Sequence, residues 1–204
     1  MWNGLKKMAA PAIAAACLLI GAKSASALSI LVDVGSPVVT AVSGGFNWDY
    51  AVSVTSSATV QSGDFFVIVD FAGYTGTHSQ PAGWTATTEA ITGPIVGLSG
   101  TVVAASDDAG TPNIRWTYTG ATIPAGTALG HFVAKSVQNK EANGSLVAQD
   151  HNFNPGHSSD GLVDVNSQSI TVPDAVPLPG VAVAGLSLFG AVGGGSLLRR
   201  RRQA

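Results

Sequence analysis

The side chains most able to do chemistry gather in residues 150–164, where carboxylate and amide groups recur at alternate positions. Such oxygen-bearing residues at this spacing are typical of calcium ligands. The first three are Asp150, Asn152 and Asn154. A calcium loop of the EF-hand kind needs glycine at its sixth position and glutamate at its twelfth, where this stretch has Pro155 and Gly161. We therefore expect a hydrophilic connection without a metal, with calcium at the three named residues as the alternative.

Catalytic chemistry would need a nucleophile with a base, or two carboxylates at a controlled separation. The chain has neither the Gly-x-Ser-x-Gly pattern of hydrolases nor the His-Glu-x-x-His pattern of zinc peptidases. His151 and His157 are six residues apart with no third ligand at a fixed spacing, which does not define a transition-metal site. We expect no enzymatic activity and no cofactor. An exported hydrolase is the less favoured alternative.

Aromatic rings offer a different chemistry, because sugars dock on flat apolar rings at exposed grooves. Trp48 and Trp116 alternate with other large residues along their strands, which predicts that both lie in the core. Tyr74 and Trp84 border a polar stretch that we expect to be a long loop, so they are the candidate sugar-stacking residues. A carbohydrate-binding module is therefore an alternative function.

Short β-strands must position these side chains. Residues 46–54 and 113–118 alternate apolar and polar side chains, which predicts half-buried strands. Residues 64–70 are apolar on both faces, which predicts a central strand covered on both sides. Further strands are expected at 29–34, 84–91, 101–105, 127–137, 144–149 and 167–172. With turn residues between the runs and no helical period, the sequence predicts an all-β domain over residues 28–172: a single antiparallel β-sandwich, immunoglobulin-like or jelly-roll.

The N-terminal residues 1–27 have the features of a secretory signal peptide. Lys6 and Lys7 precede an apolar run over 8–22, which is shorter than a membrane span needs. The small residues Ala25 and Ala27 suit signal peptidase, so we expect cleavage after Ala27. The single cysteine, Cys17, lies within the segment that would be removed.

The C-terminal residues 173–204 combine three features in order. The first is a proline motif formed by Val176, Pro177, Leu178 and Pro179. Nineteen residues without a charge follow, at 180–198, and as a helix they would span about 28 Å, close to the apolar thickness of a bilayer. The chain then has a basic cluster of Arg199, Arg200, Arg201 and Arg202. Because basic clusters stay in the cytoplasm, the preceding domain would lie outside the inner membrane.

This tail resembles the PEP-CTERM sorting signal of Gram-negative bacteria, in its VPLPA variant. Gly180 stands where that variant has alanine. The resemblance implies that an exosortase-type membrane enzyme recognises the tail and that the protein is cut near the motif. It also implies transient residence in the inner membrane, followed by transfer to the cell surface or extracellular matrix, often alongside exopolysaccharide and biofilm production. The hydrophobic tail would then be read and removed, as in other processed anchors.

The charge distribution excludes one class of partner. Between residue 27 and the arginine cluster at 199–202 there are only three basic residues, Arg115, Lys135 and Lys140, against all twelve acidic ones, a net charge of −9. A nucleic-acid protein needs a positive patch, so we expect no nucleic-acid partner. The sequence therefore predicts a secreted surface or matrix protein with a structural or interaction role, whose partners are signal peptidase, the exosortase and extracellular polysaccharide.

Overall fold

The computed structural model describes residues 29–97 and 101–175. Several features expected from the sequence lie outside these residues: the signal peptide with Ala25 and Ala27, the motif residues Val176, Pro177, Leu178 and Pro179, and the cluster Arg199, Arg200, Arg201 and Arg202. The described part is all-β, without a helix. Its strands are β1 (Ile30–Val32), β2 (Val38–Val42), β3 (Gly45–Val54), β4 (Ala58–Thr59), β5 (Phe65–Val69), β6 (Tyr74–Ser79), β7 (Trp84–Glu89), β8 (Ile95–Val96), β9 (Val102–Val103), β10 (Asn113–Tyr118), β11 (Ala128–Ser136), β12 (Glu141–Asn152) and β13 (Val163–Pro173).

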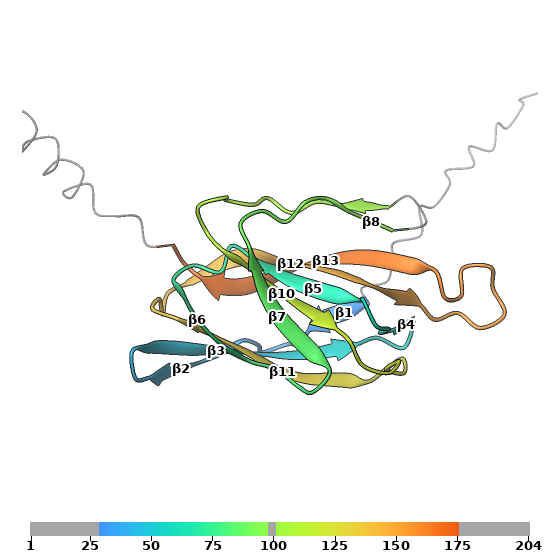
Figure 1. Ribbon diagram of the computed structural model, residues 1–204, viewed down its shortest axis with the longest axis horizontal. Helices are drawn as coiled ribbons and strands as arrows, with labels where there is room; N and C mark the ends of the chain where they lie inside the picture. The colour runs from blue at the N-terminus through green and yellow to red at the C-terminus, as the bar shows by residue number, and fades with distance from the viewer. Residues whose placement is uncertain (1–28, 98–100, 176–204) are drawn as a thin grey trace, which may run out of the picture.

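Two antiparallel sheets face each other, as Figure 1 shows. One has the order β1-β3-β11-β6, with β2 also paired to β3; the other has the order β13-β12-β5-β10-β7, with β4 also paired to β12. The hairpin of β8 and β9 lies outside the second sheet (Figure 1). This arrangement of antiparallel sheets is consistent with the expected β-sandwich.

The alternation seen in the sequence determines which side chains fill the space between the sheets. Trp48, Tyr50 and Val52 of β3 are buried, while the residues between them are only partly buried. Trp116 of β10 is also fully buried, which confirms the prediction that Trp48 and Trp116 belong to the core. The centre of this core is an aromatic cluster in which Phe66 packs against Trp84, Trp116 and Phe132, with ring centroids 4.8–5.5 Å apart.

Strand β5 is buried on both faces, as its sequence predicts. Phe66 and Ile68 belong to the core between the sheets. Val67 and Val69 face the other way, into a smaller apolar cluster that includes Ile95 of β8. The β8–β9 hairpin therefore covers the outer face of the central strand.

Two expectations about loops are wrong. The stretch 74–84 is not a long polar loop: it contains β6, a four-residue turn and the first residue of β7. The pairing of β6 with β11 contains a bulge: from Tyr74 to His78, β6 advances four residues while β11 advances only two. Gly76 lies within this bulge and has φ of 82°. The bulge interrupts the period-two pattern that would have revealed the strand.

The stretch 150–164 is also partly strand. β12 continues to Asn152 and β13 begins at Val163, so the connection is shorter than expected. Asp150 and Asn152 are therefore strand residues, and only Asn154 lies in the loop. Pairing of β12 with both β13 and β4 extends the strand into this polar sequence.

Candidate functional site

The two candidate sugar-stacking residues have different surroundings. Trp84 is only 5% exposed and packs against Tyr118 and Phe132 as well as Phe66, so its ring cannot serve as an exposed platform. Trp84 begins β7, in agreement with the strand expected at 84–91, but its side chain lies on the inward face of the sheet, so the expectation of an exposed ring was wrong. Tyr74 is half-buried and packs edge-on against Phe71.

A neighbouring histidine, His78, also packs against the Tyr74 ring. The ring stacks on His78 with centroids 6.4 Å apart, and the hydroxyl lies 2.6 Å from Nδ1 of His78. Burial raises the pKa of Tyr74, so the hydroxyl stays protonated at neutral pH. The structure does not bring Tyr74 and Trp84 together into one sugar-binding face.

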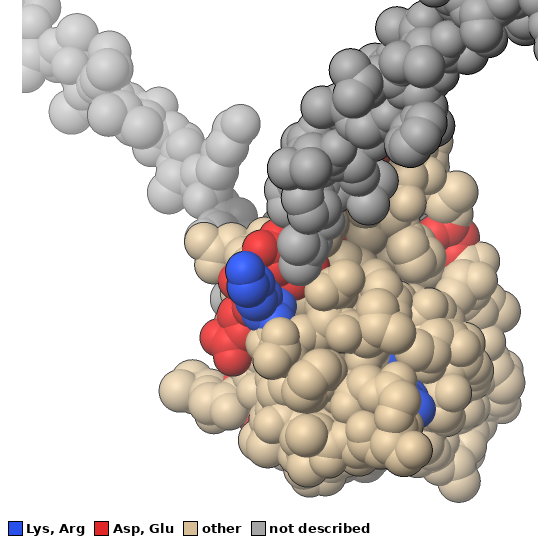
Figure 2. Space-filling model, turned by 90° about the vertical axis from the view of Figure 1, so that its left-hand side faces the viewer, with Lys and Arg blue, Asp and Glu red and all other residues tan. Residues whose placement is uncertain are grey.

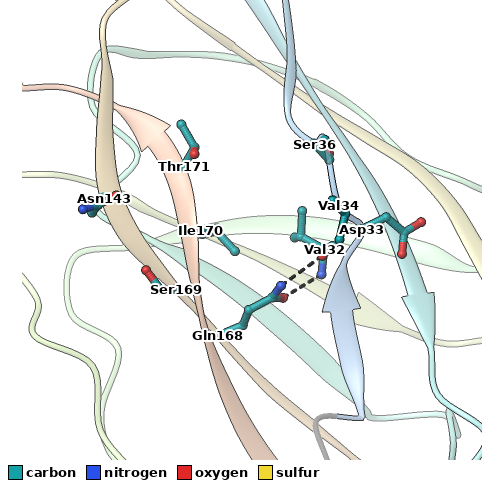
Figure 3. A pocket seen from close by; sticks show the side chains of 10 residues that line it. Val32, Asp33, Val34, Ser36, Asn143, Gln168, Ser169, Ile170 and Thr171 are labelled. Atoms are coloured by element: carbon teal, nitrogen blue, oxygen red, sulfur yellow. Dashed lines mark hydrogen bonds between the residues drawn. The ribbon is translucent and has the colours of Figure 1, made fainter.

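A polar groove lies elsewhere, along the edge strand β13. Its volume is about 220 Å³. The residues that line it are Val32, Asp33, Val34, Gly35 and Ser36 in and after β1, and Asn143, Gln168, Ser169, Ile170 and Thr171 on β12 and β13; Figure 3 labels all of them except Gly35. A second hollow of about 420 Å³, lined by Glu141, Ala142, Asn143 and Thr171, shares two residues with it. The two hollows therefore form one continuous polar surface.

Two amide side chains of β13, Gln168 in the groove and Asn166 outside its lining, bind the backbone of β1. Gln168 accepts a hydrogen bond from the backbone N–H of Val32 at 2.8 Å and donates one to the backbone oxygen of the same residue at 3.0 Å, as Figure 3 shows. Asn166 donates to the backbone oxygen of Ile30 at 3.0 Å. Both amides therefore take the place of a neighbouring strand and join the two sheets along this edge. No sequence pattern predicted these hydrogen bonds, because the bonded residues, such as Val32 and Gln168, are 136 positions apart.

The groove offers hydroxyl and amide groups, with a carboxylate near each end. Asn143 and Thr171 are a cross-strand pair, and Ser169 lies two residues along the same face of β13. Asp33 accepts a hydrogen bond from Ser53 at 2.6 Å, and Glu141 is exposed. No lysine or arginine lines either hollow. The chemistry suits a neutral polyhydroxylated ligand better than an anion.

Buried carboxylates form a separate cluster at the other end of β12. Asp150 and Asp64 are both fully buried, and Asp150 pairs across the strands with Asp164. Burial is the main cause that raises the pKa of Asp150 to about 8, and the charges of Asp164 and Asp64 add to the increase. Burial also raises the pKa of Asp64, against the lowering effect of a hydrogen bond from the backbone of Gln61 and of nearby His151.

His151 is oriented by this cluster. Its Nδ1 lies 2.9 Å from Oδ2 of Asp64, and its side chain is 18% exposed. Carboxylates that hold an imidazole in this way orient general bases in enzymes. Here the same oxygen also accepts the backbone N–H of Gln61 at 2.7 Å, which closes the turn before β5. We interpret the pair as structural.

A second polar network closes the far end of β5. Asn113 is fully buried; it accepts the backbone N–H of Asp70 at 2.7 Å and donates to Asp107 at 2.8 Å and to Thr92 at 3.0 Å. Asp70, with φ of 58°, accepts the backbone N–H of Asp108 at 2.9 Å. These carboxylates are therefore engaged in holding two loops against the sheet.

The metal alternative gains no support from this geometry. Within residues 29–97 and 101–175, no group of three or more histidine or acidic side chains is arranged to hold a metal ion. Asp150 is buried on the inner side of β12, whereas Asn154 is exposed in the loop beyond it.

Among the residues that the structure describes, no helix has the length and apolar character needed to cross a membrane. Comparison of the chain with protein families, curated proteins and solved structures finds no match in any of the three.

Proposed function

We propose that this protein is an exported cell-surface or extracellular-matrix protein, processed by an exosortase-type enzyme, with a structural or interaction role. The observation that carries the proposal is the order of the three tail features: the motif at 176–179, the uncharged segment at 180–198 and the arginines at 199–202, joined to an N-terminal signal peptide. We further propose that the exported part is a β-sandwich of immunoglobulin-like or jelly-roll topology.

The surface of the domain is compatible with this role. Figure 2 shows a face on which most side chains are neither acidic nor basic. Of the three basic residues in the domain, Arg115 forms an ion pair with Glu89 at 3.1 Å. A negatively charged domain of this kind offers no patch for a polyanion and suits neutral or weakly charged matrix components.

The decisive experiment replaces the four tail arginines, Arg199, Arg200, Arg201 and Arg202, with glutamine in the native host. We expect the processed chain to disappear from the cell surface and medium, and the full-length chain to accumulate in the inner membrane, because the basic cluster both orients the tail and belongs to the signal. Fractionation followed by mass mapping of both termini measures this.

Replacing Lys135 and Lys140 with glutamine is the matched control, since it also removes basic charge but from the domain. This variant should be processed normally. A wild-type chain that keeps Ala204 and stays permanently in the inner membrane would contradict the proposal.

The second candidate function is binding of a neutral saccharide in the groove along β13. The observation that favours it is a lining rich in hydroxyl and amide groups with no cationic side chain. Asn143 and Thr171 are the residues common to both hollows, so they would contact the ligand wherever it extends.

We expect Asn143→Ala and Thr171→Val each to weaken binding to the neutral polysaccharide of the host roughly two- to tenfold, the usual contribution of one hydrogen bond. Titration calorimetry with purified polysaccharide measures the affinity. Ser167→Ala, an exposed change on the same strand but outside the lining, is the control. Equal affinities for all variants, or a loss only with Tyr74→Ala, would show that the groove is not the site.

A further inference from the structure

Strand β2 is an unprotected edge of the first sheet. It pairs only with β3, so the backbone N–H and C=O groups along its other side have no strand partner among the described residues (Figure 1). Its sequence is Val-Val-Thr-Ala-Val, which contains no charge and no proline, and its pairing with β3 contains no bulge. Proteins ordinarily protect an edge strand with one of these features, because a bare edge is a template for pairing with another chain.

The other edges of this sheet are protected. On the same side of β3 as β2, the backbone N–H and C=O groups of Val32 in β1 are bonded to the side chain of Gln168. On the opposite side of the sheet, β6 contains the bulge at Gly76. Within the described part of the chain, β2 is therefore the edge of this sheet that is open to another strand.

The surface along this edge is apolar. Val38 is 59% exposed and Val42 is 36% exposed, and the two lie at opposite ends of β2 on the same face of the sheet. Val34, in the turn before β2, is fully exposed. Covering these side chains would add a hydrophobic contribution to the backbone hydrogen bonds of a new strand pair.

The strand is complementary to itself in an antiparallel pairing. When Thr40 of one copy lies opposite Thr40 of a second copy, Val38 lies opposite Val42 at both ends. On the other face of the same pairing, Val39 lies opposite Ala41. A two-fold axis between the two threonines makes every one of these contacts occur twice, as in the usual symmetric dimer.

Charges beside β2 favour the antiparallel orientation. The ammonium group of Lys135 donates to the backbone oxygen of Ser43, in the turn that follows β2. Asp49, which His131 contacts at 2.9 Å, is the cross-strand partner of Val38 at the other end of β2. Antiparallel pairing brings the cationic end of each copy to the acidic end of the other, whereas parallel pairing would bring like charges together.

We propose that two copies of this protein associate through β2, edge to edge and antiparallel, to form one continuous sheet across a dimer. The occupant of the edge is the same strand of a second copy. The strand order across the dimer is β6-β11-β3-β2, followed by β2-β3-β11-β6 of the second copy. The inference is independent of export and of the polar groove, since it uses only residues of β2 and its neighbours.

A charge at the two-fold axis tests the proposal. Thr40 is exposed, so Thr40→Lys should leave the fold intact while placing two ammonium groups opposite each other in the dimer. We expect the dissociation constant of the full chain, measured in detergent by analytical ultracentrifugation, to rise at least about tenfold. Thr77→Lys is the matched control, because it makes the same change at an exposed position of the protected edge strand β6 and should leave the dimer intact.

Cysteine cross-linking tests the orientation. Directly opposed residues of antiparallel strands have Cα atoms about 4.5–5.5 Å apart, within reach of a disulfide. In a chain whose single native cysteine is removed by Cys17→Ser, we expect Thr40→Cys to join two copies on mild oxidation. Val38→Cys should not, because the two copies of that position are four residues apart along the paired strands, about 13 Å.

Three outcomes would overturn the proposal. The first is a chain that stays monomeric at every concentration, or that dimerises equally well with Thr40→Lys and with Thr77→Lys. The second is equally strong cross-linking through Val38→Cys, which would show parallel pairing. The third is cross-linking of Thr40→Cys to a different protein of the host, which would assign the edge to another partner. Export is measured separately at the chain termini, so its failure would leave this test unaffected.

Discussion

Replacement of Phe66 with alanine is expected to lower the free energy of unfolding by about 3–5 kcal/mol, a large share of the total for a domain of this size. Phe66 is fully buried, and its ring contacts those of Trp84, Trp116 and Phe132. Alanine would leave a cavity between the sheets, because the three neighbouring rings come from different strands and cannot all close in on it. Urea denaturation followed by tryptophan fluorescence measures the loss.

Phe153→Ala is the matched control. This phenylalanine is 43% exposed in the β12–β13 loop, so the same change in chemistry should cost no more than about 0.5 kcal/mol. Similar losses from the two substitutions would contradict the central position of Phe66 in the core.

The protein is expected to lose stability as the pH rises from about 4 to about 8. The pKa of Asp150 is raised by burial to about 8 in the folded protein, whereas a carboxyl group in the unfolded chain has a pKa near 3.9. Between these values the folded state holds a proton that the unfolded state has lost. The stabilisation is therefore complete below about pH 4 and is lost progressively up to pH 8, at up to about 1.4 kcal/mol per pH unit.

Urea unfolding at several pH values measures this slope, and Asp150→Asn should flatten it. Asp64, whose pKa is also raised, adds a slope of the same sign. Constant stability over this range would refute the burial of a proton at Asp150.

Prediction from sequence succeeded for strands whose own residues alternate between apolar and polar or are apolar throughout. The alternation around Trp48 and Trp116 predicted both strands and their inward faces, and residues 64–70 predicted a strand covered on both sides. It failed for 74–84, where the bulge at Gly76 interrupts the alternation. It also missed β2, β4 and β8, of which β4 and β8 have two residues each, too few to show any period.

The candidate sites were less predictable than the strands. Trp84 was a candidate for exposure because it borders a polar stretch, yet in the pairing of β7 with β10 its ring lies in the core. Asp150 was taken as part of a hydrophilic loop, because a carboxylate in a polar stretch is ordinarily solvated. Its burial depends on strands that are distant in the sequence, because β12 pairs with β13 and also contacts β1.

The sequence by itself determined the all-β class, the inward position of Trp48 and Trp116 and the expectation of export, because each depends on the order of side chains within a short segment. Only the tertiary structure decided that Gln168 and Asn166 join β13 to β1, that a polar groove follows this edge, and that Asp150 is buried beside Ser29. The physical reason is that burial and hydrogen bonding between distant strands depend on how the two sheets pack against each other. The local alternation of side chains carries no information about that packing.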